Sequence, residues 1–492
     1  MGAKKSLNEL MRFQSETEAL ISVAQRLSWD QETIMPKGSS VQRAKEQAAL
    51  ARVIHSRNTN PRIADWLGEF SPRNEKEKAC KRLIQRNYDK ACKIPLELNA
   101  AIAEVTSKAH GIWVEARQNE TVSEYLPILD EIINLKIEKA EALAQGCNRY
   151  DALINEYEPN ISADEISLLF QNLRPTLVEL RKEILDKKKP KRLVGVFKEE
   201  TQLKLANELA IKFGYDLNRG RIDKAIHPFS SGTGDDVRIT TRTDPTDPFN
   251  CIYSTIHEVG HATYEQNIKK DYIFSPVGHG VSLGVHESQS RIYENQLGRS
   301  RPFTSWLYNR MRELYGDFGI DNPEEFYRCI NRVETGFIRA EADELQYNLH
   351  IMLRFDLERS LITGDLKVRD IENAWNERFE SDFGYKVEKP SLGVLQDVHW
   401  AAGAFGYFPT YTLGNIYAGC LYKKIRNAVP NLDESLSQGD VSSATGWLAE
   451  NIHIYGSLFE AKATVEKATG SDVSVKPFLT YIREKYTDLY RL

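Results

Sequence analysis

Apolar residues recur at spacings of three and four along most of this 492-residue sequence. This is the period with which side chains return to one face of an α-helix. The pattern predicts helices over long parts of the chain, namely 76–146, 163–185, 200–213, 324–361 and 440–466. Only two short segments, 150–159 and 235–240, have the β-branched or aromatic composition of strands. We therefore expect a mainly α protein with a small β element.

The sequence contains no repeat of solenoid period and no low-complexity linker. We expect one catalytic unit over 1–492, with an N-terminal helical part at about 1–225, a central part at about 226–420 and a C-terminal helical part at about 421–492. Turn-rich sequence gathers in the central part. Binding groups are often placed on loops that a rigid scaffold holds, so the central part is expected to bind metal and substrate.

Composition excludes several classes of function. The chain is 41% apolar and 27% charged with a net charge of -5, so it lacks the basic character of a nucleic-acid binder. No apolar run approaches the ~20 residues of a membrane span. Six cysteines lie far apart without a C-x-x-C pair, which indicates reduced thiols in a cytoplasmic protein. They are Cys80, Cys92, Cys147, Cys251, Cys329 and Cys420.

The segment "YSTIHEVGHATYEQN" (253–267) contains two histidines four residues apart. On a helix, His257 and His261 would share a face and present two imidazoles to one metal ion. Glu258 is rotated by about 100° from His257, beside the metal, where it could act as a general base on a metal-bound water. A proline stop and an Asn cap at Asn250 are expected to start this helix.

A catalytic zinc usually has three protein ligands, so a third ligand is expected downstream. Glu265 is excluded, because the eight residues of helix from His257 rise ~12 Å. Glu287 in "VHESQSRIYEN" follows a Gly-rich loop, opens a second helical stretch and can approach from another direction. His286 beside it is expected to contact either a ligand or the substrate.

Several motifs together resemble one family, the carboxypeptidase Taq family of zinc-dependent metallocarboxypeptidases. They are "HPF" (227–229), "DVRIT" (236–240), "HEVGH" (257–261), "HESQS" (286–290), "IRAEADE" (338–344) and "GVLQDVHW" (393–400), with "LSWDQETIMPKGSSVQRAKEQ" (27–47) near the start. The resemblance implies a helical fold with a deep substrate groove, a homodimer, and removal of single residues from peptide C-termini. It also implies that His257, His261 and Glu287 bind the metal and that Glu258 is the base.

One residue departs from the family pattern, which tends to have an apolar or aromatic residue after "HESQS". Arg291 stands there instead, one helical turn from Glu287. It could pair with the outer oxygen of the Glu287 carboxylate and lower metal affinity. The favoured interpretation is that it points to solvent or to a dimer contact.

A carboxypeptidase must recognise a free carboxylate, which the planar fork of arginine can bind with two hydrogen bonds. The pattern of 334–354 predicts one helix with a polar stripe that includes Arg339 and Asp343. On a merely solvated face these two residues would form a helix pair. The family match favours Arg339 as the carboxylate anchor over a merely solvated face. Arg238 in the predicted strand is the rival.

The segment 393–415 gathers polar and aromatic side chains. His399 and one of Tyr407 and Tyr411 are candidate donors to the oxyanion that forms when water attacks a peptide carbonyl. Gln396 is a candidate substrate contact. The alternative is an aromatic core segment with a capped loop.

We therefore predict a metal-dependent carboxypeptidase in which zinc activates a water, Glu258 takes its proton, and peptides with a free C-terminus are the substrates. Co²⁺ or Mn²⁺ could replace Zn²⁺ at such a site. A dipeptidyl carboxypeptidase or oligopeptidase of the same zinc class is the first alternative. The second is a non-catalytic helical scaffold that retains a metal, which the intact Glu258 disfavours. No nucleic-acid or membrane partner is expected.

Overall fold

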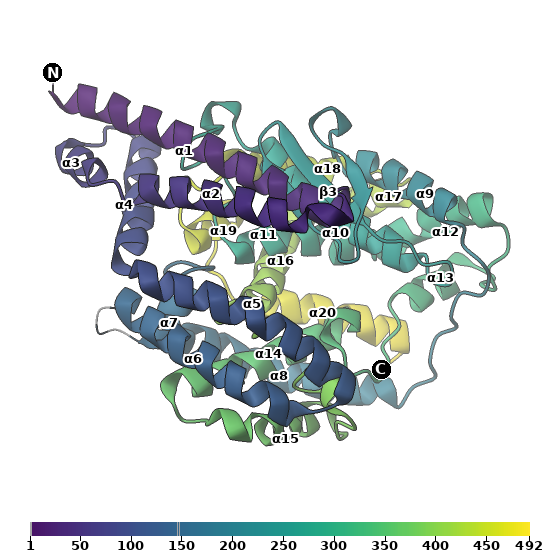
Figure 1. Cartoon of the computed structure of the whole chain (residues 1–492). Coiled ribbons are helices and arrows are strands. Elements are labelled where there is room, and N and C mark those ends of the chain that lie inside the picture. Colours follow the sequence, from purple (N-terminus) through teal and green to yellow (C-terminus); the bar gives the residue numbers. More distant parts are fainter. Residues whose placement is uncertain (1, 145, 147) are drawn as a thin grey trace. The chain divides into compact units, whose positions relative to one another are not determined.

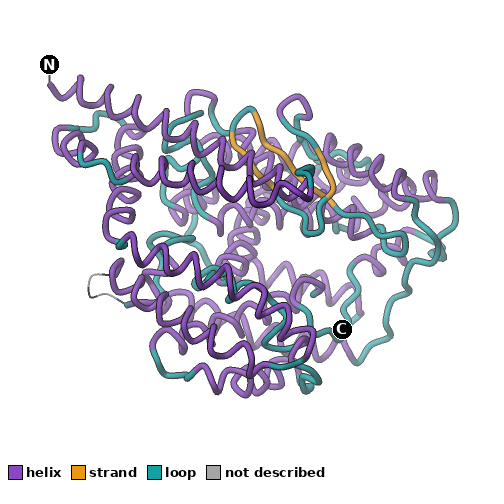
Figure 2. Tube along the Cα trace, viewed as in Figure 1, coloured by secondary structure: helices purple, strands orange, loops and turns teal. Residues whose placement is uncertain are grey.

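The computed structural model describes residues 2–144, 146 and 148–492, so the prediction for Cys147 lies outside the described residues. Figure 2 shows helix along most of the chain and strand only in one small region. The prediction of a mainly α fold with a small β element is confirmed. By the density of its contacts the chain divides into two compact units, each built from three segments.

Unit 1 consists of 1–92, 190–331 and 420–473. In Figure 1 its purple helices α1 and α2 run side by side. Its helices are α1 (Gly2–Thr33), α2 (Ser40–Asn58), α3 (Arg62–Glu69), α4 (Glu75–Lys93), α9 (Glu199–Lys212), α10 (Phe249–Asn267), α11 (Leu283–Arg291), α12 (Arg301–Tyr315), α13 (Pro323–Ile330), α17 (Leu432–Ser437), α18 (Ser442–Asn451) and α19 (Ala461–Thr469). A π-helical segment, Ile292–Gly298, continues α11 directly.

Unit 2 consists of 93–189, 332–419 and 474–492. Helices α5 and α6 pack against each other in it, and α14 packs against α8 and α15. Its helices are α5 (Leu96–Asn119), α6 (Val122–Ala144), α7 (Arg149–Ile154), α8 (Ala163–Leu185), α14 (Glu344–Thr363), α15 (Ile371–Phe383) and α20 (Lys476–Tyr490). Helix α16 (Pro409–Ala428) begins in the unit 2 segment and ends in unit 1. The sequence analysis expected one catalytic unit over 1–492 with three consecutive parts. A division by contacts does not test this expectation, so it stays a prediction.

The sheet has three strands in the order β1-β3-β2: β1 (Ile222–Lys224), β3 (Asp236–Thr241) and β2 (Ser230–Thr233). Strand β3 pairs in parallel with β1 and antiparallel with β2. The strand predicted over 235–240 is thus confirmed. Val237 and Ile239 of β3 are fully buried, and β3 packs against α10, the helix of the histidine motif.

Three local predictions were wrong. Segment 150–159 forms helix α7 and turns, because Asn148 caps the helix by accepting from the Tyr150 N–H. The predicted helix 324–361 is broken between Ile330 and Glu344. At the start of α10, Asn250 is already inside the helix, and Asp247 accepts the Phe249 N–H instead.

Cys80 and Cys251 are buried thiols, and burial raises the pKa of Cys80 to about 11. A thiol with so high a pKa is unreactive at neutral pH. Among the described residues, no helix has the length and apolar character that crossing a membrane requires.

Candidate functional site

The two predicted ligand histidines lie one turn apart on α10, and Glu287 lies on α11, which packs against it. Gly260, inside the histidine motif, faces the backbone of α11. A Cβ atom at this position would lie 2.6 Å from Cα of Ser290. The glycine therefore permits the close helix approach that brings Glu287 to the histidines.

The three side chains point ligand atoms at one another. The Glu287 Oε2 atom lies 3.7 Å from His257 Nε2 and 3.4 Å from His261 Nε2. Tetrahedral zinc with bonds of about 2.0–2.1 Å requires ligand atoms roughly 3.3–3.4 Å apart. Among the described residues this is the one group of three or more His, Cys, Asp or Glu that could hold a metal ion. Its residues fit a divalent metal in donor type and spacing.

The Nδ1 side of the His257 ring, opposite Nε2, contacts the carboxylate of Glu294, a residue that the sequence analysis missed. Glu294 Oε2 lies 2.9 Å from His257 Nδ1, and Glu294 also accepts from Arg299. A carboxylate at Nδ1 places the imidazole proton there and leaves the Nε2 lone pair for the metal. Glu294 follows Glu287 by seven residues, a spacing that returns to the same helix face and could have revealed it.

His261 is held differently. Its Nδ1 atom lies 2.7 Å from Nδ1 of His286, and Nε2 of His286 lies 3.0 Å from Oε1 of Glu265. The structure thus places His286 against a predicted ligand, one of the two positions expected for it. Glu265 lies outside the ligand group, in agreement with its exclusion from the sequence.

The side chain of Arg291 does not point to solvent, which the favoured interpretation of the sequence expected. Its Nε donates to Glu287 Oε1 at 2.6 Å, and its side chain is only 12% exposed. The i, i+4 spacing and the burial of Glu287 make this pair favourable, because a buried carboxylate needs a nearby positive charge. The arginine therefore holds the outer oxygen of the third ligand rather than facing solvent.

The electrostatics suit metal binding. Burial raises the pKa of Glu287, but the charges of Arg291 and His257 outweigh it and hold that pKa well below its usual range. Burial lowers the pKa of His261 to about 4, so this ring is neutral at pH 7. Burial also lowers the pKa of His257, but Glu287 and Glu294 reverse the shift and raise it. A histidine nitrogen must be deprotonated to bind a metal, so proton binding at His257 competes with metal binding.

Glu258 lies on α10 next to His257 and is 7% exposed. Burial raises its pKa to about 7, and the carboxylates of Glu287 and Glu294 act in the same direction. A divalent cation at the ligands would oppose this rise. A buried carboxylate with a pKa near neutrality has the property expected of a general base.

Arg339 lies in unit 2, in a short 3-10 turn (Arg339–Glu341) before α14. The helix predicted over 334–354 starts only at Glu344, because Asp343 caps it by accepting the Leu345 and Gln346 N–H groups. Arg339 and Asp343 therefore do not share a helix, and the alternative interpretation, a solvated face with a helix pair between them, is wrong. The partner of Arg339 is Asp397.

The Asp397 carboxylate is shared by two arginines. Arg339 donates to it through NH2 at 2.8 Å and through Nε at 3.2 Å, and Arg354 donates through Nε at 2.7 Å. Arg354 is fully buried and Arg339 is 8% exposed. Two guanidinium groups and one carboxylate leave one excess positive charge, which suits an anionic group.

Gln396 holds the backbone around Arg339. Its Oε1 accepts the Arg339 N–H at 2.9 Å, and its Nε2 donates to the Phe337 carbonyl. The oxygen and the nitrogen of the Gln396 amide are therefore both used to hold the backbone around Arg339.

The predicted oxyanion donors also lie in unit 2. The rings of His399 and Tyr407 are 5.6 Å apart, and those of Tyr407 and Tyr411 are 5.3 Å apart. Burial lowers the pKa of His399 to about 4, and Arg339 and Arg354 add to the effect. His399 is therefore a neutral imidazole at pH 7, and its Nδ1 has no hydrogen-bond partner among the described residues.

Arg238 lies on β3 in unit 1. Its Nε and NH2 atoms donate to the two oxygens of Asp236, and its guanidinium lies 4.7 Å from the centroid of the Trp29 ring. Both arginine candidates are thus held by an aspartate. No described contact joins Arg238 to the metal ligands.

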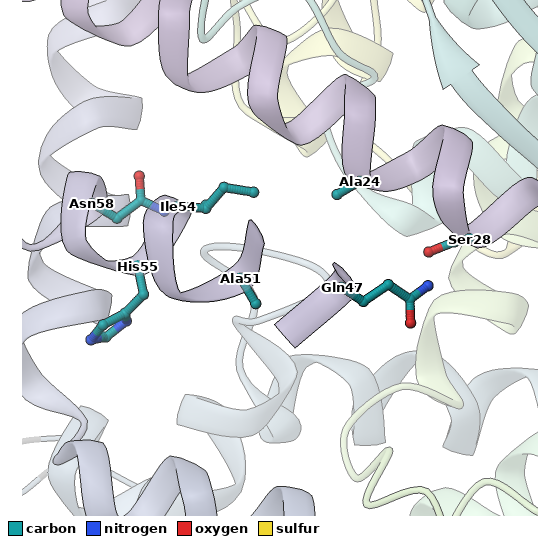
Figure 3. Close-up of a pocket in the computed structure, with 7 residues that line it drawn as sticks. All are labelled: Ala24, Ser28, Gln47, Ala51, Ile54, His55 and Asn58. Atoms are coloured by element: carbon teal, nitrogen blue, oxygen red, sulfur yellow. The ribbon is translucent and has the colours of Figure 1, made fainter. Parts of the chain in front are cut away.

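A pocket apart from the predicted site residues lies between α1 and α2 (Figure 3). It is lined by Ala24, Ser28, Gln47, Ala51, Ile54, His55 and Asn58. None of the predicted site residues is among them.

The helical fold and a group of two histidines and one glutamate define the class, a helical protein with a candidate metal site of the kind that metallopeptidases use. A family model described as "Carboxypeptidase Taq (M32) metallopeptidase" matches residues 9–486. The chain belongs to this family. It is therefore a metallocarboxypeptidase, a peptide hydrolase whose family requires a divalent metal.

Relatives support the assignment over the full length. The chain is 40% identical to a thermostable carboxypeptidase 1 of Thermus thermophilus, covering 100% of both chains. An M32 carboxypeptidase structure from Deinococcus radiodurans superposes with a TM-score of 0.96 at 34% identity, covering 99% of this chain and 100% of the other. Metallocarboxypeptidase 1 of Trypanosoma cruzi gives a TM-score of 0.96 at 32% identity, covering 98% and 99%.

Proposed function

We propose that this chain removes single amino acids from the C-termini of peptides with Zn²⁺ bound by His257, His261 and Glu287. The observation that carries the proposal is the convergence of these three ligand atoms, which all lie within 4.8 Å of one another and are of the types that zinc prefers. Co²⁺ or Mn²⁺ are the alternatives for the same ligands. The bound metal would supply Lewis acidity toward the scissile carbonyl.

Within this proposal, Glu258 takes the proton of the attacking water and delivers it to the leaving amine. Its burial and its pKa of about 7 support that role. His399, as a neutral N–H donor, and Tyr407 or Tyr411 stabilise the oxyanion. No covalent intermediate is required.

The carboxylate anchor is proposed to be Arg339, with Arg238 as the rival. Arg339 with Arg354 and Asp397, and Arg238 with Arg26 and Asp236, each carry one excess positive charge. Burial supports Arg339, whose side chain is 10% exposed against 25% for Arg238, because a buried charge interacts more strongly with a bound anion. Gln396 positions Arg339 through its backbone N–H. His286, whose two ring nitrogens contact His261 and Glu265, is assigned a positioning role in place of the predicted substrate contact.

The experiment compares blocked peptides that differ only in a free or amidated C-terminus, with products identified by mass spectrometry. Release of one residue from the free acid alone is expected. Equal cleavage of the amide would refute the carboxypeptidase proposal, and release of dipeptides would favour the dipeptidyl carboxypeptidase alternative. Metal content of the purified protein, followed by reconstitution of apo protein with Zn²⁺, Co²⁺ or Mn²⁺, tests the metal.

Three further expectations remain proposals: a homodimer, a cytoplasmic location, and no nucleic-acid or membrane partner. The scattered cysteines support the location and the net charge of -5 disfavours a nucleic-acid partner. Light scattering coupled to size exclusion tests the dimer.

A further inference from the structure

The two ligand histidines differ in what holds them. His257 contacts a carboxylate directly, whereas His261 contacts a second histidine, His286, that in turn contacts Glu265. Glu265 was excluded as a ligand from the sequence, and the proposed reaction does not use it. Its side chain is nevertheless buried, at 6% exposure, and directed at His286.

The hydrogen bonds determine where the ring protons lie. An ionised carboxylate only accepts hydrogen bonds, so Glu265 requires the proton of His286 on Nε2. In the neutral imidazole form of His286, Nδ1 is then an acceptor, and Nδ1 of His261, 2.7 Å away, is the donor. This leaves the lone pair of His261 on Nε2, the atom that faces Glu287 at 3.4 Å.

The opposite arrangement is unfavourable. If His286 carried its single proton on Nδ1, its Nε2 lone pair would face Glu265 Oε1 at 3.0 Å, two acceptors in contact. Nε2 of His261 would then carry the proton and could not bind a metal. The charge of Glu265 therefore selects the arrangement that metal binding needs.

The ring of His286 is also fixed in place. It packs against the rings of His261 and Tyr264, with centroids 4.8 and 5.1 Å away. The backbone N–H of Gly280 donates to the same Glu265 oxygen at 2.8 Å, and a Cβ at this glycine would lie 2.6 Å from Cδ2 of His286. The chain of contacts is thus enclosed on several sides.

The Glu265 carboxylate makes fewer hydrogen bonds than a buried residue with only a structural role would be expected to make. Its Oε2 atom is buried and has no hydrogen-bond partner among the described residues. Burying a carboxylate oxygen in this way costs free energy. This free-energy cost would be offset if the Glu265 carboxylate positioned the metal ligand His261.

We propose that Glu265 is a positioning residue for the metal ligand His261, acting through His286 to fix the proton on Nδ1 of His261. This rests on the proposed function in taking His261 as a ligand. Partners of this kind typically contribute a factor of about 10–100 to metal affinity.

The experiment measures Zn²⁺ affinity of apo protein by competition with a chelating dye, without any peptide. Glu265→Ala should weaken Zn²⁺ binding by about 10–100-fold. Glu265→Gln, which keeps an acceptor but loses the charge, should fall between Glu265→Ala and the wild type. In the Co²⁺-loaded protein, the visible absorption bands of Glu265→Ala should shift, because the ligand geometry changes.

Unit 1 offers a matched control in Glu18→Ala. Glu18 is 7% exposed and its Oε2 lies 2.8 Å from Nε2 of His279. His279 interacts with the charge of Glu265, but no described contact joins it to His286 or to a ligand histidine. This variant should lose comparable thermal stability as apo protein and keep the wild-type Zn²⁺ affinity.

Wild-type affinity in Glu265→Ala, or an equal loss in Glu18→Ala, would overturn the proposal. If Glu265→Ala does not fold, wild-type affinity in the nearly isosteric Glu265→Gln would overturn it in the same way. Peptide release by the Zn²⁺-loaded wild type is measured separately, so a failure of the proposed function is distinguishable from a failure of this inference.

Discussion

The metal-ligand cluster of unit 1 and the arginine–aspartate cluster of unit 2 are assembled in different ways. In unit 1, the candidate ligands His257 and His261 lie on α10. Glu287 follows His257 by 30 residues and lies on α11, which packs against α10. In unit 2, Arg339, Arg354 and Asp397 come from a turn, a helix and a loop. Clusters built from helix periodicity are visible in a sequence, whereas clusters built from loops are visible only in a fold.

The clusters also differ in charge balance. Around the metal ligands the three carboxyl groups of Glu258, Glu287 and Glu294 outnumber the two arginines, Arg291 and Arg299, as a cation site requires. Around Asp397, arginines outnumber carboxylates. The difference indicates a cation in one cluster and an anion at the other.

The largest effect is expected at the base of the metal cluster. Glu258→Gln should lower kcat by about 10²–10⁴-fold, because the amide cannot accept the water's proton. Metal content should remain that of the wild type, since Glu258 is no ligand in the proposal. Steady-state kinetics and elemental analysis on one preparation check both, and full activity would refute the mechanism.

The next effect concerns the other cluster. Asp397→Asn should destabilise the protein by about 3–5 kcal/mol, because it leaves the buried guanidinium of Arg354 without its counter-charge. Asp236→Asn is the control, since its pairs with Arg238 and Arg26 are half exposed and worth about 0–1 kcal/mol. Urea unfolding of the two variants gives the comparison, and equal losses would contradict it.

A third prediction tests the helix approach in unit 1. Gly260→Ala should cost about 1–3 kcal/mol and weaken Zn²⁺ binding, because the new methyl group meets the backbone of Ser290. In Gly446→Ala on α18, nothing lies within 4 Å of the new Cβ, so stability should be unchanged or up to ~1 kcal/mol higher. Thermal unfolding and dye competition measure the two effects.

A fourth prediction concerns the loop of unit 2 that carries His399. Glu358 is fully buried and accepts from Tyr150, Trp400 and Gly406, each at 2.8 Å. Burial raises its pKa to about 7 despite these three donors.

The folded state therefore binds more protons at this group than the unfolded state between about pH 4.5 and 7. Its contribution to stability is fully present below pH 4.5 and is lost as the pH rises to 7. Replacing Glu358 by Gln should reduce the fall in unfolding free energy over this window by about 2–3 kcal/mol. Glu388→Gln, at an exposed carboxylate, should leave the pH dependence of the wild type, as denaturant titrations at several pH values would show.

The smallest effect is expected at Arg291. Its guanidinium contacts Glu287 and competes with a cation for the charge of that carboxylate. Arg291→Met should strengthen Zn²⁺ binding about two- to fivefold, equivalent to ~1 kcal/mol or less. The same dye competition measures it, and weaker binding would mean that the arginine mainly orients the ligand.

The grouping of His257, His261 and Glu287 was predictable, because the two histidines obey the helix period and Glu287 opens the next helical stretch. Glu294 obeys the same rule and was overlooked. The strand of Arg238 was also predictable, since β-branched residues alternate there. Segment 150–159 was misassigned because the Asn148 cap determined its structure, whereas its composition favoured a strand.

Spacing along single helices and short motifs were enough to predict the helical character, the family and the grouping of His257, His261 and Glu287. The tertiary structure decided the partner of Arg339, the orientation of Arg291, and the chain from His261 through His286 to Glu265. The physical reason is that a side chain pairs with whatever charge the fold brings near it. Asp397 and Arg339 are 58 residues apart, a separation that no helix period connects.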